Sequence, residues 1–199
     1  MEKQDMLVEN AVWMFLNNWV TMQFIPEDFL LDVFLFLIPF YFVFLFDRVT
    51  NIKLAFYTLG LKPIKFKELL KNTITIFLLL FFLSYLLSFF SVFFNVSDLE
   101  LVGKEILSFP FSVIIYLFVI RVFLEEWFFR GFLVPRIGII FSSLIFALGH
   151  LSYGSVIQVL GAFVLGVFLA NTYTKTNNLW PNVFAHALYN LTIYLFLVL

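Results

Sequence analysis

Two histidines, two adjacent glutamates and an arginine lie inside apolar segments of this chain, where ionisable side chains are costly. His150 and His186 are its only histidines, and each lies in a run of hydrophobic residues. Glu125 and Glu126 are adjacent in a third such run, and Arg130 follows one helical turn later. Charged groups at membrane depth cost about 2.5–3.5 kcal/mol each and usually mark a functional pathway. Because carboxylates and imidazoles exchange protons, the chemistry expected of this group is proton transfer.

The spacing of these residues predicts several pairs along helices. Glu126 and Arg130 are four residues apart and can form an ion pair on one helix face. Glu125 is rotated by about 100° from Glu126, so we interpret it as the free carboxylate. His186 and Asn190 have the same four-residue spacing and present an imidazole and an amide together. Phe146 and His150 repeat this spacing too, which predicts an aromatic ring beside the imidazole.

The composition identifies an integral membrane protein. Of the 199 residues, 63% are hydrophobic and 13% are charged, and the mean hydropathy is +1.03. The long continuous apolar runs favour helices over the alternating pattern of a membrane β-barrel. The absence of cysteine excludes disulfides, thiol catalysis and thiolate metal sites. The net charge of −1 and the lack of a basic patch argue against nucleic acid as a partner.

We expect an all-α, polytopic transmembrane helix bundle that forms one domain over residues 1–199. About 20 apolar residues cross a bilayer, and the predicted spans are 29–46, 73–94, 107–130, 138–152, 155–172 and 179–199. Residues 7–25 are apolar but interrupted by polar side chains, so they form an interfacial helix or a seventh span, and we favour the interfacial interpretation. The tryptophans, Trp127 among them, are expected to face lipid or to anchor the interface.

Loop charges predict the orientation of the bundle. The segment 47–71 is mainly basic, with Arg48, Lys53, Lys62, Lys65, Lys67 and Lys71, so the positive-inside rule places it in the cytoplasm. Counting spans onward places Arg136 and Lys175 on the same side. The helix rise then puts the ionisable residues between the cytoplasmic face and the midplane. We therefore expect a site open toward the cytoplasm, in the cell membrane if the chain is prokaryotic.

Three motifs in this order resemble those of a known family. Residues 125–130 (EEWFFR) match the EExxxR signature of the CAAX-protease and bacteriocin-processing (CPBP, or Abi) intramembrane proteases. Residues 146–150 (FALGH) match the FxxxH motif of that family, and residues 186–190 (HALYN) match its HxxxN motif. The resemblance covers about residues 107–199, and the N-terminal half is similar in hydropathy alone. The family includes the type II CAAX prenyl endopeptidases, which act on prenylated proteins.

The resemblance implies an intramembrane endopeptidase and a role for each motif residue. Glu125 and His150 would activate the attacking water, and His186 and Asn190 would stabilise the oxyanion. The supporting residues would be Glu126, Arg130 and Phe146. Peptide hydrolysis does need a base for water and donors aimed at the developing oxyanion, and these residue types can supply both.

The motifs leave the cofactor open, because the family has been described both as metalloproteases and as metal-independent glutamate proteases. If zinc is bound, Glu125, His150 and His186 are its expected ligands, with a fourth position for water. No HExxH motif is present, and no metal ligand is assigned outright. The expected partners are membrane lipids and a peptide or lipidated protein substrate, which includes prenylated CAAX proteins.

Two other functions are compatible with the same residues. In a proton-coupled membrane transporter, Glu125, His150 and His186 would form a proton relay, which requires access from both sides of the membrane. A bacteriocin-immunity or scaffold member of the family would use the same fold without catalysis. A purely structural origin would require each polar group to tie helices together independently.

Overall fold

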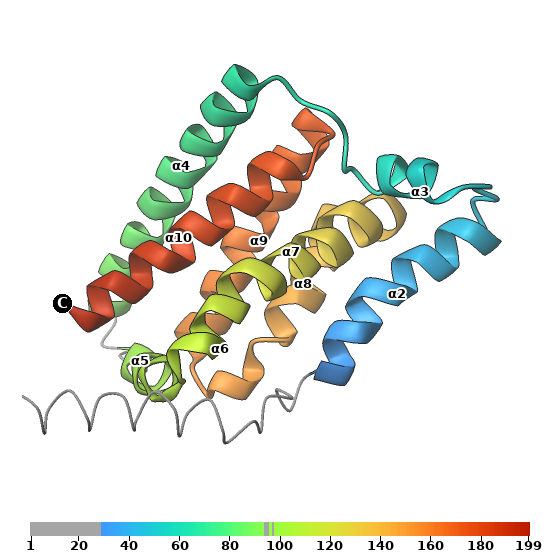
Figure 1. The fold of residues 1–199 in the computed structure, drawn as a ribbon. Helices are drawn as coiled ribbons and strands as arrows, with labels where there is room; N and C mark the ends of the chain where they lie inside the picture. Colours follow the sequence, from blue (N-terminus) through green and yellow to red (C-terminus); the bar gives the residue numbers. More distant parts are fainter. Residues whose placement is uncertain (1–28, 94–95, 97) are drawn as a thin grey trace, which may run out of the picture.

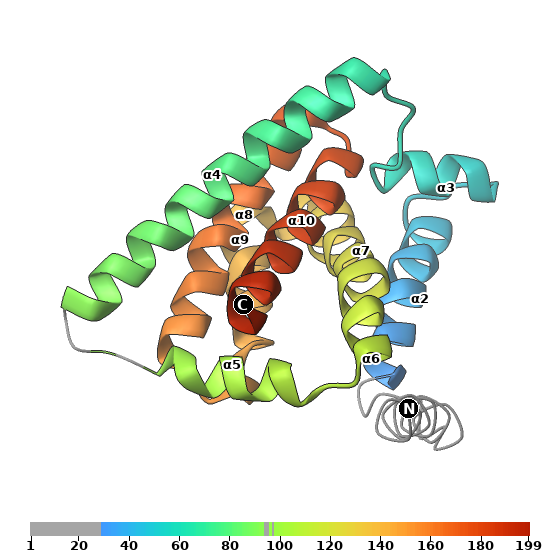
Figure 2. The same cartoon turned by 60° about the vertical axis from the view of Figure 1, so that its left-hand side comes forward.

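The structure is a computed structural model that describes residues 29–93, 96 and 98–199, and every regular element in these residues is helical. Figures 1 and 2 show a helix bundle in which α10 lies among the other helices. The long helices are α2 (Phe29–Leu45), α4 (Phe66–Phe93), α8 (Val134–Leu148), α9 (Val156–Thr176) and α10 (Trp180–Val198). The short ones are α3 (Ile52–Thr58), α5 (Leu99–Ser108), α6 (Phe111–Tyr116), η1 (Leu117–Arg121), α7 (Val122–Glu125), η2 (Glu126–Leu133) and η3 (Leu151–Tyr153). The predicted all-α class is confirmed.

The segment that carries Glu125, Glu126 and Arg130 belongs to a 43-residue apolar stretch, Phe111–Tyr153, which folds back on itself. Gly138 interrupts α8 with φ 81° and ψ 173°, a conformation that glycine adopts without steric cost. Beyond this turn the Ser142 hydroxyl donates to the Phe129 carbonyl, 2.7 Å away. A straight helix would hold these residues about 20 Å apart, so two arms lie side by side. The predicted break between spans 107–130 and 138–152 is therefore confirmed.

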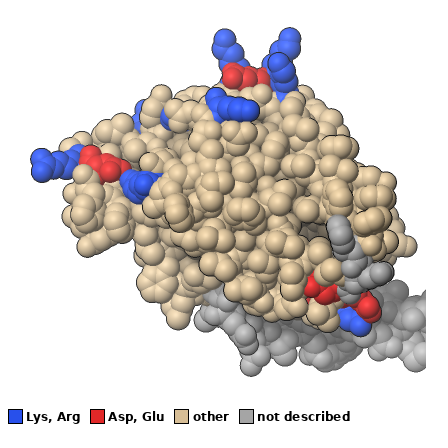
Figure 3. All heavy atoms as spheres, turned by 180° about the vertical axis from the view of Figure 1, so that it is seen from behind, with Lys and Arg blue, Asp and Glu red and all other residues tan. Residues whose placement is uncertain are grey.

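Four described helical segments are long and apolar enough to cross a membrane: Phe66–Phe93, Phe111–Tyr153, Val156–Thr176 and Trp180–Val198. The helix α2 is apolar but shorter, at 17 residues. With the second segment counted as two arms, these helices correspond to the predicted spans, whereas the helix expected at 7–25 lies outside the described residues. On the face drawn in Figure 3, charged side chains gather toward two ends, and a wide band between them is uncharged. This is the surface of an integral membrane protein.

The turns after α2, at Gly138 and between α9 and α10 lie at the same end of the bundle. Arg136, beside the Gly138 turn, forms an ion pair with Asp47 at the end of α2. The turn between α9 and α10 contacts the segment before α4, where the Asn178 side chain donates to the Lys62 carbonyl at 2.9 Å. We call this the basic end, since it contains the lysine-rich segment 47–71. The grouping of these turns agrees with the predicted topology, and the side that faces the cytoplasm stays a prediction.

At the opposite end Asp98 caps the start of α9. Its carboxylate accepts hydrogen bonds from the Ser155 hydroxyl at 2.7 Å and from the Val156 amide at 2.5 Å, with a longer one from Ile157 at 3.4 Å. Partial burial raises the pKa of the Asp98 carboxyl, but these hydrogen bonds outweigh it and hold that pKa below its ordinary value. Asp98 thereby ties the segment before α5 to α9.

The helix α8 ends before the predicted span 138–152 does. It ends at Leu148, and His150 lies in the turn that leads through η3 to α9. Gly149 and Gly154 flank this turn, and Gly154 has a positive φ of 66°. Because glycine is the residue that most readily leaves helical geometry, the chain turns here instead of continuing as a helix. The expectation that His150 lies within a continuous helix is therefore wrong.

Trp127 forms the centre of the largest core cluster, between α2, α3 and η2. Its side chain is completely buried, and its ring stacks with Phe36 and Phe123. Its indole N–H donates to the Phe36 carbonyl at 3.3 Å, which satisfies the buried donor. The expectation of a lipid-facing or interfacial position is thus wrong for Trp127, because aromatic rings on three neighbouring helices enclose it.

Candidate active site

Glu126, Arg130 and His186 form a buried ionic cluster between η2 and α10. One carboxylate oxygen of Glu126 lies 3.1 Å from Nη1 of Arg130 and 2.9 Å from Nδ1 of His186. The exposed fractions of these residues are 0%, 1% and 8%. The predicted Glu126–Arg130 pair is present, and it also orients the second histidine. The burial of both charges requires such pairing, since an isolated buried charge is very unfavourable.

Asn182 completes this cluster and was missed in the sequence. Its side-chain amide donates to the second Glu126 oxygen at 3.3 Å and to the Leu169 carbonyl at 2.8 Å, and its own oxygen accepts from Thr172 at 3.1 Å. Asn182 precedes His186 by four residues, the same spacing that separates His186 from Asn190. That repeated spacing on α10 was the available signal, because polar residues at i and i+4 share one helix face.

The ring of Phe146 lies at the centre of the motif residues. The Arg130 guanidinium lies 4.4 Å from its centroid, and the His150 and His186 rings lie 4.6 Å and 6.3 Å away. Phe129 packs edge-on against it at 5.1 Å. The predicted contact between Phe146 and His150 is present, and the same ring also connects that histidine to the Glu126–Arg130 pair. One aromatic side chain thus brings both histidines to a common location.

His150 has a defined tautomer when it is neutral. Its Nδ1 lies 2.8 Å from the Phe146 carbonyl, which can only accept, so Nδ1 must carry the hydrogen. Nε2 then has a lone pair and can accept a hydrogen bond from water. The imidazole is half-buried, and the Tyr153 ring lies 6.0 Å away. A fixed, partly accessible lone pair is the property required of a general base.

Glu125 lies in a second polar cluster and is not the free carboxylate that we expected. Its carboxylate is 3.8 Å from Nε of Arg121, one helical turn earlier. The same guanidinium pairs with Asp32 on α2, and the Tyr116 hydroxyl also donates to Asp32. The expectation failed because it considered Arg130 alone as a partner, although Arg121 lies four residues before Glu125, a spacing that also pairs side chains on one helix face. None of the described contacts of Glu125 is to a histidine.

The two glutamates diverge where the backbone changes its helical type. Two π-helical segments, Leu117–Arg121 and Glu126–Leu133, flank the single α-helical turn that ends at Glu125. A π-helical turn holds an additional residue and is frequent at functional sites. Glu126 is directed to α10 and Glu125 to Arg121, so adjacent side chains serve separate clusters.

Asn190 lies one helical turn beyond His186 on α10. Its side chain is half-buried and makes no hydrogen bond to any residue that the structure describes. Its amide group is therefore available to a ligand, unlike that of Asn182. Glu125 lies at the end of α7, His150 lies in the turn after α8, and His186 and Asn190 lie on α10. Of these four residues, His150 and His186 share the neighbour Phe146, and His186 also contacts the Glu126 carboxylate.

The residues expected to bind zinc do not form a metal site. Among residues 29–93, 96 and 98–199, no three His, Asp or Glu side chains are grouped closely enough to hold a metal ion. The Glu125 carboxylate contacts Arg121 and so has another partner, whereas both histidines keep Nε2. This donor arrangement does not fit a three-ligand zinc centre, and we derive no step that uses one.

The match to a known family covers the part of the chain that holds the motifs. Residues 107–192 match the family described as Type II CAAX prenyl endopeptidase Rce1-like. This segment is Rce1-like. The match supports a CAAX-type protease with a peptide or protein substrate, and the apolar helices support an integral membrane protein. No curated protein and no solved structure gives a significant match to the chain.

The Rce1-like segment packs closely against the N-terminal half at Gly131, directly after Arg130. A Cβ atom at Gly131 would lie 2.4 Å from the Leu59 carbonyl oxygen. Gly60 has φ 92°, and its carbonyl accepts from the Leu179 amide at 2.9 Å. The turn 59–61 therefore supports the helix of the EExxxR motif through backbone contact that a larger residue would prevent.

Proposed function

We propose that this protein is an intramembrane endopeptidase that hydrolyses a peptide bond in a membrane-associated substrate of the prenylated CAAX type. The observation that carries the proposal is the anchoring of both motif histidines beside Phe146. Nδ1 of each imidazole is held by a fixed acceptor, the Phe146 carbonyl for His150 and the Glu126 carboxylate for His186. Each ring thereby keeps Nε2 for a reacting group.

In the proposed mechanism, His150 and Glu125 activate water. The Nε2 lone pair of His150 accepts a hydrogen bond from the water, and the Glu125 carboxylate takes the proton as the oxygen attacks the peptide carbonyl carbon. The protonated Glu125 then donates this proton to the leaving nitrogen when the carbon–nitrogen bond breaks. Glu125 reaches the water by turning from Arg121, which keeps Asp32 as its second counter-charge.

The developing oxyanion would be stabilised by His186 and Asn190. Because Nδ1 of His186 donates to Glu126, Nε2 can donate only when the ring is protonated. In that protonated ring Nδ1 still donates to the Glu126 carboxylate, which fixes the ring orientation as the carboxylate partner of a histidine does in other hydrolases. The unpaired amide of Asn190, one turn further, would supply a second donor.

The charges of the two clusters are consistent with this role. Glu126 and Arg130 cancel, whereas Glu125 and Asp32 share the single guanidinium of Arg121. With His186 protonated, as the oxyanion contact requires, His150 neutral and all carboxylates ionised, the seven groups carry no net charge. A proton taken from water gives these groups one positive charge, which the negative charge of the oxyanion balances. In a region of low dielectric this limits the net charge to one unit throughout.

Cleavage of a farnesylated CAAX peptide by purified variants tests the assignment of roles. His150→Ala and Asn190→Ala should each lower kcat by about 10²–10³-fold, because each removes one base or oxyanion contact. Their Tm should stay within a few degrees of wild type, since neither side chain belongs to the fully buried ion pair. Unchanged kcat in both variants would contradict the proposal.

The same protein in liposomes separates proteolysis from the alternatives. Glu125→Gln should abolish cleavage on our account. Normal cleavage with loss of proton-coupled flux would identify a transporter. A biological effect that survives Glu125→Ala together with His150→Ala, at equal expression, would identify a non-catalytic immunity or scaffold role.

A further inference from the structure

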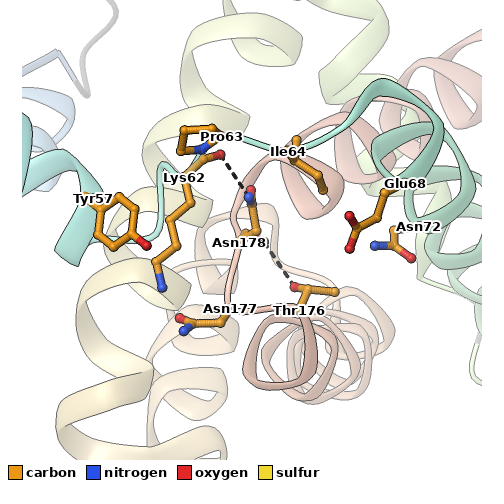
Figure 4. A pocket seen from close by; sticks show the side chains of 9 residues that line it. All are labelled: Tyr57, Lys62, Pro63, Ile64, Glu68, Asn72, Thr176, Asn177 and Asn178. Carbon is orange, nitrogen blue, oxygen red and sulfur yellow. Dashed lines mark hydrogen bonds between the residues drawn. The ribbon is translucent and has the colours of Figure 1, made fainter.

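A polar pocket of about 300 Å³ lies at the basic end, between the segment before α4 and the turn that joins α9 to α10. Figure 4 shows Tyr57 and Lys62 on one side of this pocket and Glu68 and Asn72 on the other, with Asn177 near the lysine. None of these residues belongs to the motifs of the candidate active site. The volume falls at the lower end of the range for small-molecule sites, about 300–1,000 Å³.

The pocket presents two opposite charges that do not pair with each other. The Lys62 ammonium lies 5.2 Å from the centre of the Tyr57 ring, and it forms no ion pair with any described residue. The Glu68 carboxylate, on the first turn of α4, likewise has no basic partner in the described part of the chain. Partial burial lowers the pKa of Lys62, since desolvation disfavours the charged form. Both groups would gain from a ligand of opposite charge.

The backbone around Lys62 is held in place before any ligand binds. The buried side chain of Asn178 donates to the Lys62 carbonyl at 2.9 Å and accepts from the Trp180 amide at 3.0 Å. The Thr176 hydroxyl donates to the Asn178 carbonyl at 3.2 Å, as Figure 4 also shows. A site whose walls are already fixed loses less conformational entropy on binding.

The charge pattern selects among membrane headgroups. The basic end contains the lysines expected at the headgroup level of the bilayer, so a phospholipid can reach the pocket. The charges of Lys62 and Glu68 sum to zero, which matches a headgroup with one negative phosphate and one positive ammonium group. A purely anionic headgroup would leave Glu68 unpaired, and a quaternary choline has no N–H to donate to it.

We propose that this pocket binds the phosphoethanolamine headgroup of phosphatidylethanolamine, with the phosphate at Lys62 and the primary ammonium at Glu68. The Tyr57 hydroxyl and the Asn177 amide stand on the phosphate side, and Asn72 stands beside Glu68 on the ammonium side. The bound lipid would hold α3, α4 and the α9–α10 turn together. This inference is independent of the proposed proteolysis.

Thermal unfolding of the purified full-length protein in detergent tests the proposal. Phosphatidylethanolamine at about ten times its Kd should raise Tm by about 3–6 °C. Phosphatidylcholine with identical acyl chains should raise it much less. Lys62→Gln and Glu68→Gln should each remove the difference between the two lipids. Lys53→Gln, which changes a lysine of α3 outside the pocket, should retain it.

The lipid response of the variants also separates the two halves of the site. Phosphatidylglycerol, which has the phosphate without the amine, should lose its effect in Lys62→Gln and keep it in Glu68→Gln. Equal shifts with phosphatidylethanolamine and phosphatidylcholine in the wild type would overturn the proposal, as would a preference that survives both pocket variants. If water-soluble glycerophosphoethanolamine raised Tm as much as phosphatidylethanolamine does, the result would overturn the proposal that the occupant is a membrane lipid.

Discussion

Glu126→Gln and Glu125→Gln should affect different properties of the protein, although the two residues are adjacent. Glu126 is completely buried and pairs with Arg130 at 3.1 Å, so its neutralisation leaves a buried guanidinium without a counter-charge. Breaking a buried ion pair in this way costs about 3–5 kcal/mol. At about 2–4 °C per kcal/mol for a chain of this size, Tm should fall by about 6–20 °C.

Glu125→Gln should leave stability nearly unchanged and remove catalysis. The Glu125 side chain is 16% exposed and lies 3.8 Å from Arg121, which keeps its closer partner Asp32. Loss of a partly exposed contact costs about 1 kcal/mol or less, so the expected fall in Tm is under about 4 °C. Without the proposed base, kcat should fall by about 10²–10⁴-fold.

Two measurements on each variant decide the matter: thermal unfolding in detergent, followed by tryptophan fluorescence, and cleavage of a CAAX peptide. The control is the double variant Glu126→Gln with Arg130→Met, which removes both charges and should recover part of the lost Tm. Wild-type stability in Glu126→Gln, or equal losses of stability in the two single variants, would refute the separation into two clusters.

Three further predictions follow from the fold and the site. Gly131→Ala should lower the free energy of unfolding by about 1–3 kcal/mol or more, because the added Cβ would lie 2.4 Å from the Leu59 carbonyl oxygen. Gly161→Ala is the control and should be tolerated, because its Cβ would lie 4.0 Å from the nearest side-chain atom. Because the pKa of the Asp98 carboxyl is lowered in the folded protein, Asp98 should stabilise the fold fully at a pH above its ordinary pKa of 3.8, and this stabilisation should be lost as the pH falls through the lowered pKa. In a profile of Tm against pH, Asp98→Asn should weaken this loss of stability in acid. Cleavage should persist in metal-free protein under strong chelation, since no three-ligand group forms among the described residues; loss of activity that zinc restores would contradict this.

Local periodicity was sufficient to predict much of the architecture and some of the site. Apolar run length located the helices and the break between the predicted spans 107–130 and 138–152. The four-residue spacings correctly predicted the Glu126–Arg130 pair and the Phe146–His150 contact. These contacts lie within one helix or its end, where the helix repeat alone determines which side chains are neighbours.

Contacts between distant segments were not predictable in this way. The pairing of Arg121 with Asp32 joins residues 89 positions apart and connects the helix before Glu125 to α2. The contact between His186 and Glu126 spans 60 positions, and it depends on how α10 packs against η2. Hydropathy also placed Trp127 at the lipid boundary, although neighbouring aromatic rings bury it. In each case the partner is set by helix packing, which a single sequence does not encode locally.

The proposed endopeptidase activity is tested most directly by cleavage of a farnesylated CAAX peptide by the purified wild-type protein, with Glu125→Ala assayed at equal concentration. The wild type should release the C-terminal tripeptide, and Glu125→Ala, with a Tm close to wild type, should release none. Cleavage at equal rates by both proteins would contradict the assignment of the site. Absence of cleavage by the wild type would contradict the CAAX-type endopeptidase activity itself.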